Sequence, residues 1–115
     1  MVSIRDEAIR LYGWAYKIGL EVKKMDRGED LLKRLLYDIR GESLPGRFRE
    51  VLIENLMYLF DTKELGYKKI PKSLLEKGVY GDKFHYIKAA ILMGFMDALA
   101  TSDSGGGSGS SDDSN

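Results

Sequence analysis

The chain has 115 residues and contains no cysteine. This absence excludes a disulfide scaffold, a thiol nucleophile and any zinc or iron–sulfur site that needs cysteine ligands. It also fits a reducing compartment, and we expect the protein to be cytoplasmic. With a single histidine besides, the sequence predicts no metal site and no cofactor.

Long apolar runs are missing as well. The N-terminal stretch MVSIRDEAIRLYGW carries charges where a signal peptide needs an apolar core. No apolar run approaches the roughly 20 residues of a membrane span. We therefore expect neither a secretory signal nor a membrane helix.

Neither sign of charge is in excess, because 18 basic residues face 18 acidic ones. The last fifteen residues, 101–115, read TSDSGGGSGSSDDSN and hold three aspartates but no basic or apolar side chain, which predicts a disordered tail. Leaving out these three aspartates gives 15 acidic residues and a net charge of +3 for residues 1–100, the expected single domain. Nucleic-acid binding would therefore depend on local clusters of basic side chains.

Proline is scarce too, with two residues in the chain, and the apolar spacing is helical almost throughout. The sequence predicts an all-α fold, a compact bundle of four longer helices and one short helix. We expect the longer helices at about residues 4–25, 29–40, 44–60 and 83–100, and the short helix at 71–77. Ser3, Ser43 and Asp82 are the predicted N-caps of the first, third and last helices.

The last helix contains AAILMGFMDALA and is apolar on nearly every side, so we expect it to be the central element. Small residues recur in it every four positions, at Ala90, Gly94 and Ala98, which permits close approach of another helix. Gly13 and Gly19 each cost the first helix about 1 kcal/mol relative to alanine, and we expect a close neighbour to explain them.

The sequence contains no catalytic motif. GxGxxG, GxxxxGK[ST], HExxH and GxSxG are all absent. His85, at the start of the last helix, has no cysteine to form a dyad or metal site with, and we interpret it as a partly buried packing residue. We therefore predict a protein that is not an enzyme, and a small helical enzyme using His85 is a distant alternative.

Basic residues give the more informative pattern. In the second helix Lys33, Tyr37 and Arg40 are three or four positions apart, on the side away from the leucines, with Arg34 beside them. If the second and third helices fold back on each other, a basic strip with one aromatic ring would suit phosphate contacts and base stacking. The candidate nucleic-acid-binding residues are Lys33, Arg34, Tyr37, Arg40, Arg47 and Arg49.

A solvated helix face explains the same pattern, because Asp30 and Asp38 each lie four residues from Arg34 and are available for ion pairs. Two further basic clusters are weaker candidates for nucleic-acid binding, since they include helix-end residues whose charge is explained by the helix dipole. They are Lys17, Lys23, Lys24 and Arg27, and Lys68, Lys69 and Lys72.

Two further features allow a function without nucleic acid. Tyr12, Trp14 and Tyr16 are either interface aromatics or core residues. The apolar excess of the last helix is explained by burial inside the monomer or by self-association. The alternative function is thus a helical adaptor that binds itself or a partner helix.

The order of four segments resembles a known family. LLKRLLYDIRGES, RFREVLIENLMYLF, IPKSLLEKG and FHYIKAAILMGFMDAL are similar to the C-terminal helical part of the large subunit of CRISPR-Cas type I-B effector complexes. That part resembles the small subunit of Cascade-type complexes, which some systems also make separately by internal translation. A chain that starts at Met1, just before a helix cap, would suit such a product.

The resemblance implies a non-catalytic helical bundle in a crRNA-guided surveillance complex of antiviral defence. Its implied partners are the large subunit, the backbone subunits, neighbouring copies of itself, the crRNA and the target DNA. The implied role is to stabilise the R-loop, both the target strand and the displaced strand. The family's individual binding positions do not transfer through so loose a pattern, and the acidic tail departs from a typical nucleic-acid binder.

Overall fold

The computed structural model describes residues 3–61, 63, 71 and 83–102 and confirms the all-α prediction. The described part of the chain holds four helices and no strand, as the 3.6-residue apolar period predicts. They are α1 (Ile4–Lys23), α2 (Gly28–Arg40), α3 (Pro45–Leu59) and α6 (Phe84–Ala100).

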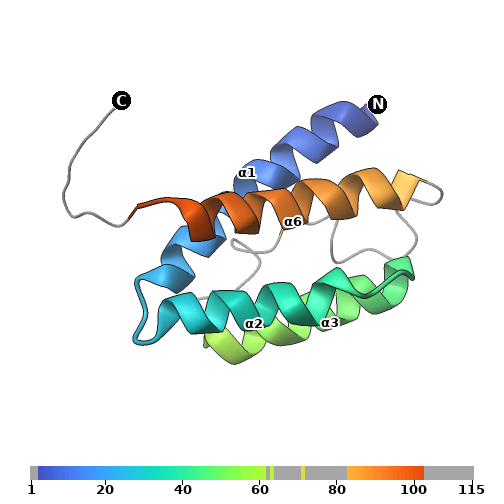
Figure 1. Ribbon diagram of the computed structural model, residues 1–115. Helices are drawn as coiled ribbons and strands as arrows, with labels where there is room; N and C mark the ends of the chain where they lie inside the picture. The colour runs from blue at the N-terminus through green and yellow to red at the C-terminus, as the bar shows by residue number, and fades with distance from the viewer. Residues whose placement is uncertain (1–2, 62, 64–70, 72–82, 103–115) are drawn as a thin grey trace.

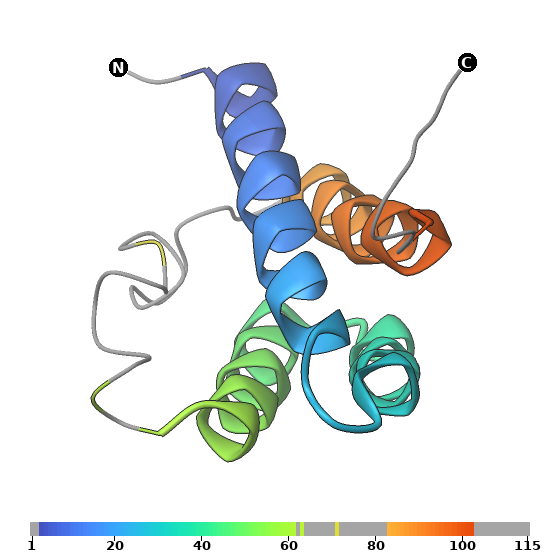
Figure 2. The ribbon, with the colours of Figure 1, turned by 90° about the vertical axis from the view of Figure 1, so that its left-hand side faces the viewer.

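The helices pack around one core. α2 and α3 form an antiparallel pair, and α6 lies along the other side of the bundle beside α1 (Figure 1). α1 crosses α6, and its C-terminal end lies next to α2 and α3 (Figure 2). All four helices contribute fully buried side chains, among them Leu11, Leu35, Leu52 and Phe95. This burial, rather than helix propensity, is the main source of stability in such a bundle.

Glycine allows the crossing of α1 and α6. A Cβ added to Gly94 would lie 2.5 Å from the Tyr12 carbonyl oxygen, and one added to Gly19 would lie 2.6 Å from the Ala98 Cβ. The expected close approach is therefore confirmed at Gly94, Ala98 and Gly19. It is wrong for Gly13, whose added Cβ would meet nothing within 4 Å.

The end of α6 is held by side chains of α1. The Lys23 ammonium donates to the carbonyl oxygens of Ala98 and Leu99, each at 3.1 Å, and of Thr101 at 2.6 Å. These carbonyls lie where a helix leaves its last acceptors without an intrahelical partner. A cation from one helix thus caps another.

The three aromatic residues near the middle of α1 also serve this junction. The Tyr12 hydroxyl donates to the Asp97 carboxylate, and the Tyr16 hydroxyl lies 3.1 Å from that of Thr101. The half-buried Trp14 meets Phe95 edge to face, with ring centroids 6.2 Å apart. Of the two interpretations of these aromatics, packing within the chain is the one observed.

The helix ends agree with the sequence in part. Ser3 caps α1, since its hydroxyl accepts from the Asp6 amide at 3.0 Å. Ser43 is not a cap: Leu44 is the N-cap of α3, without a side-chain hydrogen bond, and Pro45 opens the helix. Proline there has a preset φ and needs no amide donor, which explains the shift by one residue.

α6 was expected to be the central element, and the structure leaves part of its apolar surface exposed. Met93 and Met96 are 55% and 54% exposed, so the other described helices do not enclose α6 on every side. His85 is also exposed rather than partly buried. It is the second residue of α6, one position after the buried Phe84.

Several predictions fall outside the described residues. They concern the short helix beyond Pro71, the Asp82 cap, the tail from residue 103 and the cluster Lys68, Lys69 and Lys72. Among the described helices, none combines the length and the apolar character that a bilayer span requires.

Candidate nucleic-acid interface

The face of α2 opposite the core carries a short basic row. Leu32, Leu35 and Ile39 are buried, so the helical period turns three other side chains to solvent. We call them the α2 row: Lys33, Tyr37 and Arg40, all exposed.

Within the α2 row, Arg40 and Tyr37 form one unit. The guanidinium carbon of Arg40 lies 5.0 Å from the centre of the Tyr37 ring, within the range of a cation–π contact. The ring is 68% exposed. The contact with the ring leaves the N–H donors of the Arg40 guanidinium available to an anion. The ring thus positions the cation at the surface without burying its charge.

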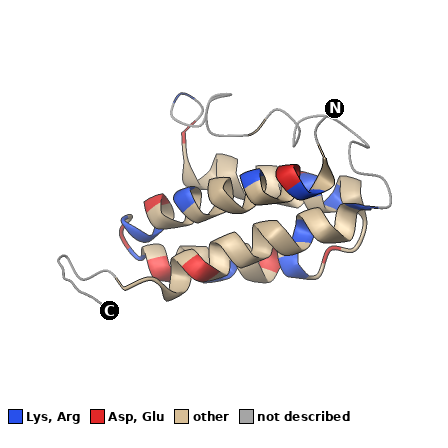
Figure 3. Cartoon of the chain, turned by 90° about the horizontal axis from the view of Figure 1, so that it is seen from above, with Lys and Arg blue, Asp and Glu red and all other residues tan. Residues whose placement is uncertain are grey.

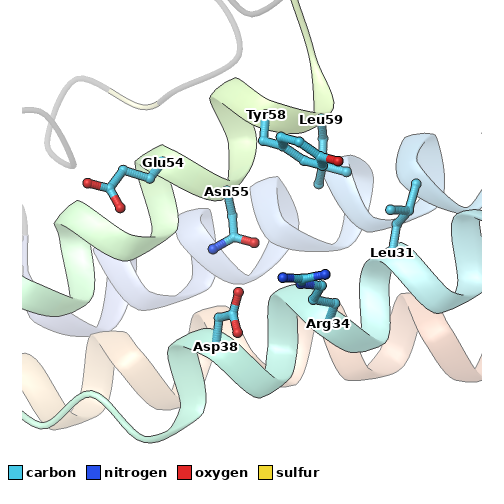
Figure 4. A pocket seen from close by; sticks show the side chains of 7 residues that line it. All are labelled: Leu31, Arg34, Asp38, Glu54, Asn55, Tyr58 and Leu59. Carbon is cyan, nitrogen blue, oxygen red and sulfur yellow. The ribbon is translucent and has the colours of Figure 1, made fainter.

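Arg34 does not belong to this row. It is turned toward α3, where it lines a cavity of about 260 Å³ that we call the α2–α3 pocket. Figure 4 shows Arg34 and Asp38 pointing from α2 toward Asn55 and Tyr58 of α3. The lining residues are Leu31, Arg34, Asp38, Glu54, Asn55, Tyr58 and Leu59.

The two arginines of α3 are engaged locally. Arg47 makes an ion pair of 2.7 Å with Glu50, one turn further along the helix. The hydrogen bond that the Arg47 guanidinium donates to the Glu50 carboxylate, with the nearby carboxylate charges, raises the pKa of Arg47. Arg49 is half-buried and already engaged by a neighbour.

The six candidate residues therefore do not form one continuous basic strip. α2 and α3 do fold back on each other, as the strip required. Packing nevertheless gathers Lys33, Tyr37 and Arg40, turns Arg34 aside and leaves Arg47 beside a carboxylate. Figure 3 shows basic and acidic positions interspersed along the helices in view.

The basic cluster at the end of α1 is divided in the same way. Lys23 is occupied by the end of α6, which accounts for it structurally. Arg27 has a left-handed backbone, with φ of 58°, in the turn that leads into α2. Lys17 and Lys24 are exposed.

The described residues contain no cluster of side chains suited to a metal ion. No three histidine or acidic side chains among them are close enough to hold a metal ion. His85 lies at the surface, and its ring neighbour is Phe84, at 5.7 Å between centroids.

Sequence reasoning missed the α3 side of the pocket. Glu54, Asn55 and Tyr58 line it, and Tyr58 is 83% exposed. Their three- and four-residue spacing places them on one side of α3, a signal that was readable. Which side faces Arg34 depends on how α2 and α3 pack, which the spacing does not give.

Comparison with known proteins gives no relative: no family model, no curated protein and no solved structure matches the chain.

Proposed function

We propose that the protein is a non-catalytic small subunit of a crRNA-guided CRISPR surveillance complex, in which it holds nucleic-acid backbone and stabilises the R-loop. The observation that carries the proposal is the α2 row, where two exposed cations flank an exposed ring on one helix face. The resemblance of the sequence to the helical end of a type I-B large subunit supplies the biological setting. The proposed partners are the large and backbone subunits, neighbouring copies, the crRNA and the target DNA.

Weak binding suits this role. Base pairing with the guide provides sequence specificity, so a protein subunit needs only sequence-independent contacts to backbones. Each neutralised phosphate of a single strand contributes a slope of about −0.7 to log K against log salt. The two cations of the α2 row give a modest affinity by themselves, which repeated copies along one strand would multiply.

The experiment is charge reversal of the α2 row. The double variant Lys33→Glu, Arg40→Glu is compared with Lys17→Glu, Lys24→Glu, which changes the net charge equally at two exposed positions, one in α1 and one at its C-cap. We measure the anisotropy of labelled single strands with the isolated chain and target-DNA binding by the assembled complex, each across a salt series. The α2 variant should weaken binding about tenfold or more and flatten the salt dependence.

Equal effects of the two variants would contradict the site, because only net charge would then matter. Purification of the tagged protein from its native host, with and without nuclease, tests the setting. Recovery of CRISPR effector subunits with a crRNA supports the complex. Recovery only of unrelated proteins, unchanged by nuclease, contradicts it.

A second candidate function is a helical adaptor that binds protein alone. The exposed face of α6 favours it, since Tyr86, Met93 and Met96 are each more than half exposed and their spacing places them along one side of the helix. Methionine suits adaptable apolar contacts. Met93→Gln with Met96→Gln should then abolish capture of the partner, and the binding should depend little on salt.

A further inference from the structure

The α2–α3 pocket adjoins the α2 row. Arg34 follows Lys33 and Asp38 follows Tyr37, so the two sets lie on adjoining sides of α2, about 100° apart. The volume of about 260 Å³ is slightly below the roughly 300–1,000 Å³ of sites for drug-sized ligands. The pocket therefore suits one ring system attached to a strand that passes along the row.

The pocket contains both hydrogen-bond donors and hydrogen-bond acceptors. Arg34 brings N–H donors and Asp38, one turn away, brings carboxylate acceptors (Figure 4). Among the described residues, neither side chain makes a hydrogen bond or an ion pair. The amide nitrogen of Asn55 donates to the Val51 carbonyl at 3.0 Å, which uses one of its two N–H donors.

The charge of the pocket argues against a phosphate. Among the described lining residues Arg34 is the one cation, whereas Asp38 and Glu54 are both acidic, so their formal charges sum to −1. An anion would be repelled by the two carboxylates. A neutral ring with donors and acceptors on its edge meets no such penalty.

One wall of the pocket is aromatic. The Tyr58 ring is 83% exposed, and Leu31 and Leu59 add apolar surface beside it. A flat heteroaromatic ring stacked on tyrosine is a recurrent way in which proteins hold single-stranded bases.

We propose that the α2–α3 pocket binds one unpaired guanine of a single strand whose backbone lies along the α2 row. Guanine offers the O6 and N7 acceptors to Arg34 and N–H donors, including the N2 amino group, to Asp38, while its ring stacks on Tyr58. Uracil lacks the amino donor, and cytosine lacks the O6 and N7 pair. The inference rests on the proposed function, because the row must hold the strand.

The test measures the anisotropy of labelled oligonucleotides of about ten residues, a length within the site sizes of single-strand binders. Oligouridine is compared with the same strand carrying one central guanine, adenine or cytosine, and a DNA series runs in parallel. The central guanine should tighten binding about five- to tenfold over uracil, the lower part of the range for one bidentate contact. A guanine preference in either series supports the proposal and identifies the strand.

Three variants assign the effect. Asp38→Ala and Tyr58→Ala should each remove the guanine preference, while the affinity for oligouridine in the Asp38→Ala variant keeps its salt dependence. Met57→Ala, which truncates an exposed apolar side chain next to Tyr58, should leave the preference intact. A separate NMR experiment needs no variant. Adding guanosine to the wild-type chain should shift the amide resonances of residues 34, 38 and 55, and adding cytidine should not.

The outcomes separate this inference from the proposed function. No binding of any strand would overturn both. Salt-dependent binding with equal affinity for all four central bases, and no shift with guanosine, would overturn the guanine pocket and leave the α2 row standing. If the wild type shows no guanine preference and Tyr58→Ala loses the same affinity for every central base, the ring stacks on bases of any kind, and the assignment of guanine is overturned.

Discussion

The Tyr12 hydroxyl donates a hydrogen bond to the Asp97 carboxylate, which joins the middle of α1 to the last turns of α6. This bond holds the proton on the phenol, and together with desolvation and the nearby charges it raises the pKa of Tyr12 above 10.0. The folded protein therefore keeps the Tyr12 proton to a higher pH than the unfolded chain does. The link between the two helices is thus sensitive to alkali.

The raised pKa of Tyr12 determines how the stability of the protein changes with pH. A raised pKa in the folded state adds stability that is fully present below pH 10.0 and is lost as the pH rises through the folded value. Tyr12→Phe should be less stable than the wild type at neutral pH, and the difference should shrink above pH 10.0. Thermal unfolding of both proteins across this range checks it, and a constant difference would contradict the role of the phenol proton.

At the scale of elements, the crossing of α1 and α6 depends on the absence of a side chain at Gly94. An added methyl group would lie 2.5 Å from the Tyr12 carbonyl oxygen and 2.8 Å from the Ala15 Cβ. Backbone cannot yield as a flexible side chain does, so the helices would have to separate. Gly94→Ala should lower the free energy of unfolding by about 1–3 kcal/mol.

Gly13→Ala is the matched control on α1. It adds the same methyl group where nothing lies within 4 Å, so it should raise the free energy of unfolding by about 0.5–1 kcal/mol. Urea denaturation of the two variants measures the contrast. Equal changes in both would mean that helix propensity, not close packing, governs Gly94.

The elements themselves were largely readable from the sequence. Apolar residues at helical spacing predicted the four helices that the structure describes, and Ser3 was correctly identified as a cap. Ser43 was not, because Pro45 sets the start of α3 through its own backbone geometry. The contact of Lys23 with the end of α6 joins residues 75 or more positions apart, and no local pattern encodes it.

The candidate site was readable only in part. Spacing predicted that Lys33, Tyr37 and Arg40 share a face, and the structure places all three at the surface. The spacing did not separate Arg34 from these three residues. Neighbouring residues of a helix point about 100° apart, and which of them faces α3 is decided only by how α2 and α3 pack. The pairing of Arg47 with Glu50 has a three-residue spacing that is visible in the sequence.

At the scale of the whole molecule, charge is divided unequally along the chain. Residues 103–115 hold three aspartates and no basic residue, so the rest of the chain carries a net charge of +3. We expect this acidic stretch to compete with nucleic acid for the basic side chains. Such competition is strongest at low salt, where the Debye length is greatest.

Removal of residues 103–115 should therefore tighten binding of single strands about two- to fivefold at low salt, an effect of less than about 1 kcal/mol, and leave the thermal midpoint unchanged. Replacing Asp103, Asp112 and Asp113 by asparagine keeps the length and should reproduce the gain. Anisotropy titrations at two salt concentrations measure it. A gain in the truncated chain alone would assign the effect to bulk instead of charge.

The hydrogen bonds of Lys23 to the end of α6 affect how this side chain reacts with chemical labels. An ammonium group that donates to three carbonyl oxygens is withheld from acylating reagents, whereas Lys17 and Lys24 are exposed to them. Labelling with lysine-reactive esters should therefore be weaker at Lys23 than at its neighbour Lys24 and at Lys17. A missing product at Lys23 then reports its internal hydrogen bonds, whereas products at Lys17 and Lys24 report exposed amines.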